Sequence, residues 1–226
     1  MAWQTISGET PIDPSGLKVK GVVHRGQLNA AENANVHKAT MKYLARKPSQ
    51  RIAPFTLTWV KKLHQEMFGA VWAWAGKFRT RDGFNVGIPW IHIETSLHTM
   101  LENLACWVES GMGPLEIAAR LHHESVRIHP FSNGNGRWSR MLANIWLKQN
   151  GHPETEWPDE SVGPESVIRK DYIAAVKAAD AGDFAPLLEL HRKYTPTRKP
   201  PVTGRPPEPK AAKPKGRKGR PKRSRG

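Results

Sequence analysis

The sequence predicts a mainly α-helical protein with one small β-hairpin and a basic C-terminal tail. Residues 115–126 and 138–146 each carry apolar side chains at the i, i+3, i+4 spacing that places them on one face of a helix. Between Phe78 and Ile93 this spacing is lost, and the pair Asp82-Gly83 is typical of a hairpin turn. We therefore expect a helical bundle interrupted by a hairpin, and we call residues 78–93 the flap.

The helices are expected at residues 27–46, 56–68, 95–110, 114–127, 136–150, 164–180 and 184–193. The first is rich in alanine and stops before Pro48, because proline cannot continue a helix. The second places Leu57, Val60, Leu63, His64 and Met67 on one side. Residues 1–26 are rich in Gly, Pro and Ser and are expected to be irregular, with a short strand near Val19 to Val23.

Composition predicts one domain followed by a tail. The 226 residues are 38% apolar and include nine tryptophans, which is sufficient for a single core. The chain carries a net charge of +15, of which residues 198–226 hold +11 through twelve Lys or Arg and one Glu. Since this tail has almost no apolar residues, it is expected to be disordered. We divide the chain into an irregular segment 1–26, a domain 27–196 and a tail 197–226.

Two features of the sequence bear on where the protein is found in the cell: it has a single cysteine, and it lacks a long apolar run. Cys106 cannot form an intramolecular disulfide, and its neighbours on an apolar stripe predict a buried packing role. Nothing at the N-terminus resembles a secretory leader, and no apolar run reaches the length of a membrane span. We expect a soluble cytoplasmic protein without a membrane partner.

The run His-Pro-Phe-Ser-Asn-Gly-Asn-Gly-Arg-Trp-Ser-Arg, residues 129–140, carries the clearest chemistry. It joins two predicted helices, and Gly134-Asn135-Gly136 opens the second one. Backbone N–H groups at a helix N-terminus have no helical acceptor, and glycine lets an anion approach them closely. Arg137 and Arg140 add permanent charge with a donor geometry suited to phosphate. With His129 as a general base, the run predicts phosphoryl or nucleotidyl transfer.

The run resembles the signature of the Fic (Fic/Doc) family, His-x-Phe-x-Asp/Glu-Gly-Asn-Gly-Arg-x-x-Arg. Further likenesses are Trp74-Ala75-Gly76, Gly151-His152-Pro153 and the segment Tyr172 to Leu187. The closest resemblance is to the mobile mystery protein B subfamily. It implies a Fic-type helical bundle that transfers AMP from ATP to a Ser, Thr or Tyr hydroxyl of a target protein. It also implies a mobile-element or toxin–antitoxin setting with a helix-turn-helix partner protein.

The resemblance also implies roles for individual residues. His129 and Arg137 would be catalytic; Gly134, Asn135, Gly136, Arg137, Arg140 and Asn144 would bind the nucleotide phosphates; and Asp82, Gly83 and Phe84 of the flap would dock the target segment. Arg140 would meet the γ-phosphate, and the Asn135 side chain can add a donor. Alternatives from the residues alone are a carbonyl-capping histidine, a surface arginine and an asparagine that merely lies on a helix face.

Two further positions bear on activity. Asn133 replaces the usual carboxylate, and since Mg²⁺ prefers anionic oxygen, Asn133 is expected to be a weak metal ligand. This leaves slower AMP transfer, another phosphate-containing donor group, or a silent enzyme. Glu32-Asn33 resembles the end of the family's inhibitory helix motif, with Leu28 at its Ser/Thr position. The resemblance implies an ion pair of Glu32 with Arg140 that blocks ATP; the alternative is a glutamate that faces solvent.

The tail predicts an association with nucleic acid. Gly219, Arg220 and Pro221 form the core of an AT-hook flanked by basic residues, which suits the minor groove of A·T-rich DNA. Non-specific attraction to DNA or RNA phosphates would follow from the charge alone. A second candidate function is therefore a catalytically weak or inactive regulator that associates with nucleic acid.

Overall fold

The computed structural model describes residues 14–22, 24–82, 87–158 and 167–197, and these residues are mainly helical. The elements are α1 (Arg25–Leu44), α2 (Leu57–Phe68), the 3-10 helix η1 (Trp90–His92), α3 (Ile93–Glu109), α4 (Pro114–Ile128), α5 (Asn135–Gln149), α6 (Val167–Asp180) and α7 (Ala185–Tyr194). The predicted fold class is thus confirmed. Outside the described ranges lie much of the N-terminal segment, the flap residues Gly83 and Phe84, and the tail with Gly219, Arg220 and Pro221.

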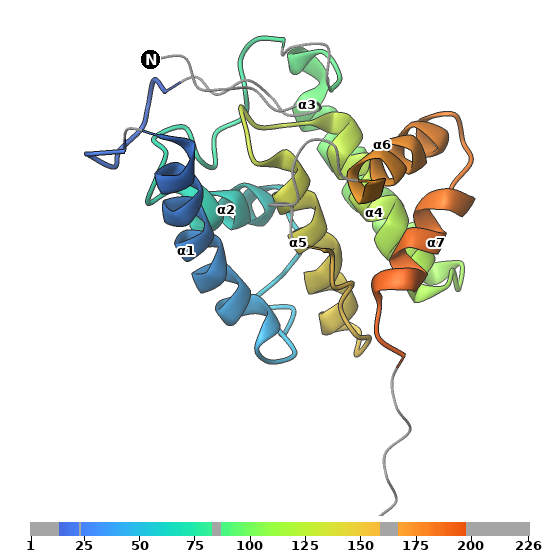
Figure 1. Cartoon of the computed structure of the whole chain (residues 1–226). Coiled ribbons are helices and arrows are strands. Elements are labelled where there is room, and N and C mark those ends of the chain that lie inside the picture. The colour runs from blue at the N-terminus through green and yellow to red at the C-terminus, as the bar shows by residue number, and fades with distance from the viewer. Residues whose placement is uncertain (1–13, 23, 83–86, 159–166, 198–226) are drawn as a thin grey trace, which may run out of the picture.

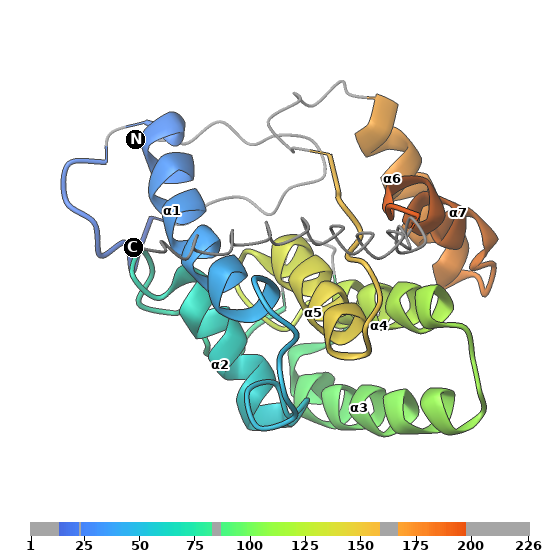
Figure 2. The same ribbon diagram turned by 90° about the horizontal axis from the view of Figure 1, so that it is seen from below.

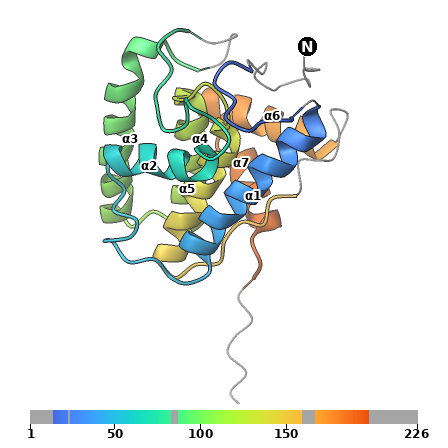
Figure 3. The same ribbon diagram turned by 90° about the vertical axis from the view of Figure 1, so that its left-hand side faces the viewer.

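Helix α5 lies in the middle of the bundle (Figure 1). Helices α1 and α2 lie on one side of it, and α4 lies on the other with α6 and α7 beyond (Figure 2). Viewed from the side, α1 passes in front of α5, with which it is in contact (Figure 3). The loop between α4 and α5 contains the first half of the motif, residues 129–134, and lies at the N-terminal end of α5 (Figure 1).

Local sequence explains where the helices around this loop begin and end. Thr56 caps α2, since its hydroxyl accepts the Trp59 N–H at 3.3 Å. Pro114 opens α4, where its missing N–H costs nothing. The indole of Trp138 in α5 is fully buried and donates to the Val60 carbonyl of α2 at 3.1 Å. These contacts fix the register of α5 against α2.

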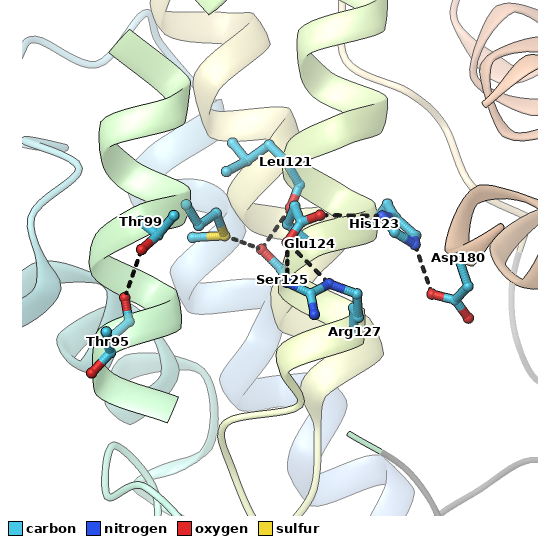
Figure 4. A network of polar contacts seen from close by, with 9 residues as sticks. Thr95, Thr99, Leu121, His123, Glu124, Ser125, Arg127 and Asp180 are labelled. Atoms are coloured by element: carbon cyan, nitrogen blue, oxygen red, sulfur yellow. Dashed lines mark hydrogen bonds and ion pairs between the residues drawn. The ribbon is translucent and has the colours of Figure 1, made fainter. Parts of the chain in front are cut away.

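Polar side chains tie α4 to its other neighbours (Figure 4). The Ser125 hydroxyl donates to Leu121 O at 2.7 Å and lies 3.4 Å from Met100 Sδ of α3. His123 Nε2 lies 2.8 Å from Asp180 Oδ1 of α6. Burial alone would lower the pKa of His123, but its hydrogen bonds with Glu124 and Asp180 raise it, so the contact between α4 and α6 favours the protonated form of His123.

Three expectations, for the flap hairpin, the N-terminal strand and Cys106, are not met in the described residues. No β-pairing is found in the flap residues 78–82 and 87–93, because side chains take up the backbone groups that a hairpin would pair; the Asp82 carboxylate, for example, accepts the Trp90 N–H at 2.8 Å. An isolated bridge between Leu17 and Trp72 stands in place of the short N-terminal strand. Cys106 is exposed, because the buried face of α3 is formed by residues at other helical positions, namely Ile93, Leu97, Met100 and Leu104. None of the described helices combines the length and apolarity needed to cross a membrane.

Candidate active site

Two residues with left-handed backbone conformation bound the loop that carries the motif. His129 ends α4 with φ 51° and ψ 59°, and Gly134 precedes α5 with φ 78°. A left-handed histidine costs on the order of 1–3 kcal/mol and persists only where its surroundings hold it. Such strain is found disproportionately at functional sites. The loop therefore turns sharply at both ends and brings the end of α4 close to the start of α5.

Phe131 anchors the middle of the loop in the core. Its side chain is fully buried and meets the Trp138 ring edge-on, with centroids 5.1 Å apart. Its backbone is clamped by the amide of Asn135, which accepts Phe131 N–H at 2.9 Å and donates to Phe131 O at 2.8 Å. Since Asn135 is only 2% exposed, the predicted side-chain donor to a bound anion was wrong. Its backbone N–H keeps a place at the helix N-terminus.

His64 of α2 packs against the loop and bonds to its backbone, a role that the sequence did not reveal. Its ring stacks on Phe131 at 3.6 Å, its Nδ1 accepts Gly76 N–H at 2.9 Å, and its Nε2 therefore donates to Asn133 O at 3.0 Å. Burial lowers the pKa of His64 to about 3, so the ring is neutral at pH 7. In the sequence this histidine is one member of an apolar helix face, and only its partners distinguish it.

His129 is held as a neutral imidazole. Burial lowers its pKa to about 4, a hydrogen bond with the Val126 backbone raises it, and the nearby Arg79 charge lowers it further. An unperturbed histidine has a pKa near 6.5. The lower pKa leaves His129 unprotonated at pH 7, which is the form that a general base requires.

The start of α5 forms an uncapped helix N-terminus. No side chain of the described residues caps it, and its first N–H groups have no helical acceptor. A Cβ on Gly136 would meet only Arg140 NH2, at 3.6 Å, so the backbone there is open to a ligand. A Cβ on Gly134 would lie 2.7 Å from the Phe68 ring. The two glycines thus have different purposes: Gly134 allows the turn, and Gly136 leaves space for an anion.

This difference predicts opposite effects of one substitution. Gly134→Ala is expected to lower the free energy of unfolding by about 2–4 kcal/mol, from left-handed strain and the clash with Phe68. Gly136→Ala is expected to unfold like the wild type but to bind a nucleotide triphosphate about tenfold more weakly, the loss of one hydrogen bond to a charged group. Urea unfolding and calorimetric titration measure the two quantities. Equal destabilisation by both substitutions would contradict this assignment.

Arg137, on the first turn of α5, is paired with Glu32 of α1. The Arg137 NH1 lies 2.7 Å from Glu32 Oε2, and the guanidinium lies 4.8 Å from the centre of the Phe68 ring. The other oxygen of Glu32 accepts the Trp72 indole N–H at 2.6 Å. Glu32 is 5% exposed, so it does not face solvent. The predicted partner of Glu32, Arg140, was wrong: the ion pair forms with the first arginine of the motif, one turn closer to the helix N-terminus.

Arg140 lies on the side of α5 that faces the C-terminal helices. Its Nε donates to Gly136 O at 3.0 Å, and its guanidinium lies 5.9 Å and 5.7 Å from the ring centres of Trp157 and Tyr172. Burial lowers the pKa of Arg140, although an arginine stays charged at any physiological pH. The structure does not support the alternative of a surface arginine, because Arg140 is half-buried.

Asn144 and Asn133 are both engaged with backbone. Asn144 donates to Thr155 O and accepts Thr155 N–H, each at 3.0 Å, so its predicted phosphate contact was wrong and its role is to hold the segment after α5. Asn133 Oδ1 accepts the Gly134 N–H at 2.6 Å. No group of three or more His, Cys, Asp or Glu is assembled within the described ranges. The residues at this site are therefore poorly suited to bind Mg²⁺ directly.

The buried neutral histidines predict an acid-sensitive fold. Burial lowers the pKa of His191 to about 3, as it does for His64. Below pH 6.5 the unfolded chain binds protons that the folded chain does not, so stability present above pH 6.5 is lost as the pH falls toward 3. By pH 5 each of these two groups costs about 2 kcal/mol. Urea unfolding at pH 7.5 and 5.0 measures the loss.

A comparison of variants isolates one histidine from all other titrating groups. In His64→Gln the loss of unfolding free energy between pH 7.5 and 5.0 is expected to be about 2 kcal/mol smaller than in the wild type. His98, exposed on α3, offers the matched control, since His98→Gln should leave the pH dependence unchanged. If His64→Gln and the wild type lose the same free energy, His64 is not held neutral by the fold.

The sequence is similar to those of known proteins. Residues 54–147 match the model of the Fic/DOC family. The protein adenylyltransferase fic-1 of Caenorhabditis briggsae is 30% identical over 125 residues, 54% of this chain and 23% of that protein. The chain therefore spans about a quarter of that relative's length.

Solved structures show the same fold. Residues 134–508 of Fic-1 from C. elegans superpose with a TM-score of 0.61 at 23% identity, covering 80% of this chain and 52% of that one. BepC of Bartonella tribocorum, solved with bound AMPPNP, superposes with a TM-score of 0.58 at 21% identity, covering 83% and 99%. With the motif of residues 129–140 placed between two helices of this bundle, residues 54–147 of the chain belong to the Fic/DOC family.

Proposed function

We propose that this protein transfers AMP from ATP to a Ser, Thr or Tyr hydroxyl of a target protein. The observation that carries the proposal is the juxtaposition at the loop between α4 and α5: a neutral His129, an open helix N-terminus at Gly136, and Arg137 on the same turn. The similar proteins are protein adenylyltransferases, which supports the same reaction.

In this proposal His129 takes the proton of the target hydroxyl. Its Nδ1 is buried and the ring is hydrogen-bonded to the Val126 backbone, so we assign the base to Nε2. The freed oxygen attacks the α-phosphorus of ATP, the bond from the α-phosphorus to the bridging oxygen breaks, and pyrophosphate leaves with the electron pair. AMP stays on the hydroxyl oxygen.

The start of α5 would hold the phosphates during this step. The N–H groups of residues 135–137 would donate to a phosphate, and Arg137 with Arg140 would neutralise the charge that develops on pyrophosphate. The flap residues Asp82, Gly83 and Phe84 would align the target segment. Asn133 would be at most a weak ligand for a Mg²⁺ ion bound to the ATP phosphates. We therefore expect the protein itself to contribute little to Mg²⁺ binding.

We further propose that Glu32 inhibits this reaction. Its carboxylate forms an ion pair at 2.7 Å with the guanidinium of Arg137, which would otherwise bind phosphate. The Trp72 indole N–H donates to the same carboxylate and holds it in place. An ATP phosphate would have to displace Glu32 to reach Arg137. The wild-type protein is therefore expected to bind ATP weakly.

Labelled donors test the choice of transferred group. The Glu32→Gly variant is incubated with a cell extract and, separately, with ATP labelled in the α- or the γ-phosphate. Label on protein from α-ATP alone supports AMP transfer. Label from γ-ATP alone supports transfer of phosphate and overturns the proposed donor chemistry.

The tail supports a second candidate function, association with nucleic acid. We propose it from the charge of +11 over residues 198–226 and the Gly219-Arg220-Pro221 core. A helix-turn-helix partner from the subfamily resemblance would fit the same setting. Binding of duplex DNA that falls steeply between 50 and 200 mM salt (about the range over which phosphate contacts weaken) and is lost in a chain truncated after residue 196 would support it. Binding that survives truncation would contradict it.

A further inference from the structure

We propose that Arg79 is a positioning residue that joins the base of the flap to His129, so that flap and general base move as one unit. The inference deepens the transfer reaction proposed above and rests on it. The sequence motif does not include Arg79, which lies 50 residues before His129 in the chain.

Arg79 contacts the backbone at three consecutive residues, of which the middle one is His129. Its Nε donates to His129 O at 2.8 Å and its NH2 reaches Ile128 O at 3.5 Å. Its own backbone N–H donates to Pro130 O at 2.9 Å. The carbonyl groups before, at and after the strained left-handed residue are thus all held by one arginine.

The same guanidinium holds both limbs of the flap. Its NH1 donates to Arg81 O at 3.1 Å and lies 3.4 Å from the Asp82 carboxylate, and its NH2 donates to Ile88 O. On the second limb, Gly87 lies so close that a Cβ there would be 2.6 Å from His129 Cβ. The flap base is therefore packed directly against the proposed general base.

Burial and chemistry explain why this residue must be arginine. The Arg79 side chain is 6% exposed, so its charge is satisfied by the carbonyl groups and not by water. A planar guanidinium has five N–H donors pointing in fixed, divergent directions, whereas a lysine ammonium is a compact point charge. Only arginine can bind the two flap limbs and the end of α4 at once.

The arrangement has a consequence for the reaction. A target segment aligned on the flap would be placed relative to His129 through Arg79, and a misplacement of about 1 Å can cost roughly 100-fold in rate. In this proposal Arg79 acts through its protein partners and is not itself a ligand of substrate or nucleotide. It would act on the turnover rate through His129 and leave ATP binding at α5 unaffected.

The experiment compares Arg79→Met and Arg79→Lys with a matched control, Arg127→Met. Arg127 lies at the same end of α4 and loses the same charge, but it pairs with Glu124 on its own helix. In Arg79→Met we expect the turnover rate to fall about 10- to 100-fold while the KM for ATP stays within about threefold. Arg79→Lys keeps the charge and is expected to lose rate as well, whereas Arg127→Met should keep the wild-type rate.

A second readout does not need activity. The imidazole of His129 is followed by NMR during a pH titration: its pKa is expected to rise in Arg79→Met, because a positive charge that lowers it is removed, and to stay near the wild-type value in Arg127→Met. If the wild type transfers no AMP, the proposed function fails, and the titration still judges Arg79. A folded Arg79→Met chain with unchanged His129 titration and unchanged amide exchange over residues 87–92 would overturn the inference.

Discussion

Replacing Glu32 by glycine is expected to tighten ATP binding by about 10- to 100-fold, the range of a coupling between two sites that compete for one group. The Glu32 carboxylate is buried and bound to Arg137 at 2.7 Å, so a phosphate must displace it. Without the carboxylate, the guanidinium is available to the nucleotide. Calorimetric titration with a non-hydrolysable ATP analogue measures the change.

Glu66 supplies the control for this prediction. Its carboxylate also bridges α1 and α2, through an ion pair with Lys42 at 2.7 Å. Glu66→Gly should therefore leave the affinity for the analogue unchanged. Glu32→Gln, which removes the charge but keeps the side-chain length, should bind with intermediate affinity. Equal affinities of wild type and Glu32→Gly would show that the ion pair does not obstruct the phosphate site.

Loss of the general base is expected to have the largest effect on turnover. His129→Ala should lower the rate of AMP transfer by about 100- to 10,000-fold, the range for a positioned general base. The affinity for ATP should change little, because the proposed phosphate contacts come from α5. Single-turnover transfer in the Glu32→Gly background measures the rate, and titration measures the affinity.

The pH dependence of this rate gives an independent check. Because the pKa of His129 is lowered to about 4, almost all of it is unprotonated above about pH 6, and titration of His129 should not reduce the rate between pH 6 and pH 8. His98→Ala, on an exposed position of α3, should match the parent at every pH. A rate that halves near pH 6.5 would contradict a buried, depressed His129.

Local patterns in the sequence were sufficient for the helices and the motif loop. The apolar spacing at 115–126 and 138–146 predicted α4 and α5, and the two glycines predicted the helix N-terminus between them. These features depend on residues a few positions apart, for which spacing is informative. The flap was harder: Asp82-Gly83 signals a hairpin, but the backbone of the described flap residues is bonded by side chains such as that of Arg79.

The partners of individual side chains could not be predicted in the same way. Glu32 was expected to meet Arg140, yet the packing of α1 against α2 and α5 brings it to Arg137. Asn144 resembles a nucleotide-binding position, but the segment after α5 folds back and occupies both groups of its amide. His64 and Arg79 lie outside the motif in sequence and support it only in three dimensions. Such contacts depend on tertiary packing, which residue spacing does not encode.

One measurement tests the central claim, AMP transfer by His129 under restraint by Glu32. Glu32→Gly and the double variant Glu32→Gly/His129→Ala are incubated with α-labelled ATP and a cell extract, and label on protein is counted. The account predicts strong labelling by Glu32→Gly, weak labelling by the wild type, and none above background by the double variant. Equal labelling by the single and the double variant, or no labelling by Glu32→Gly despite tight ATP binding, would contradict it.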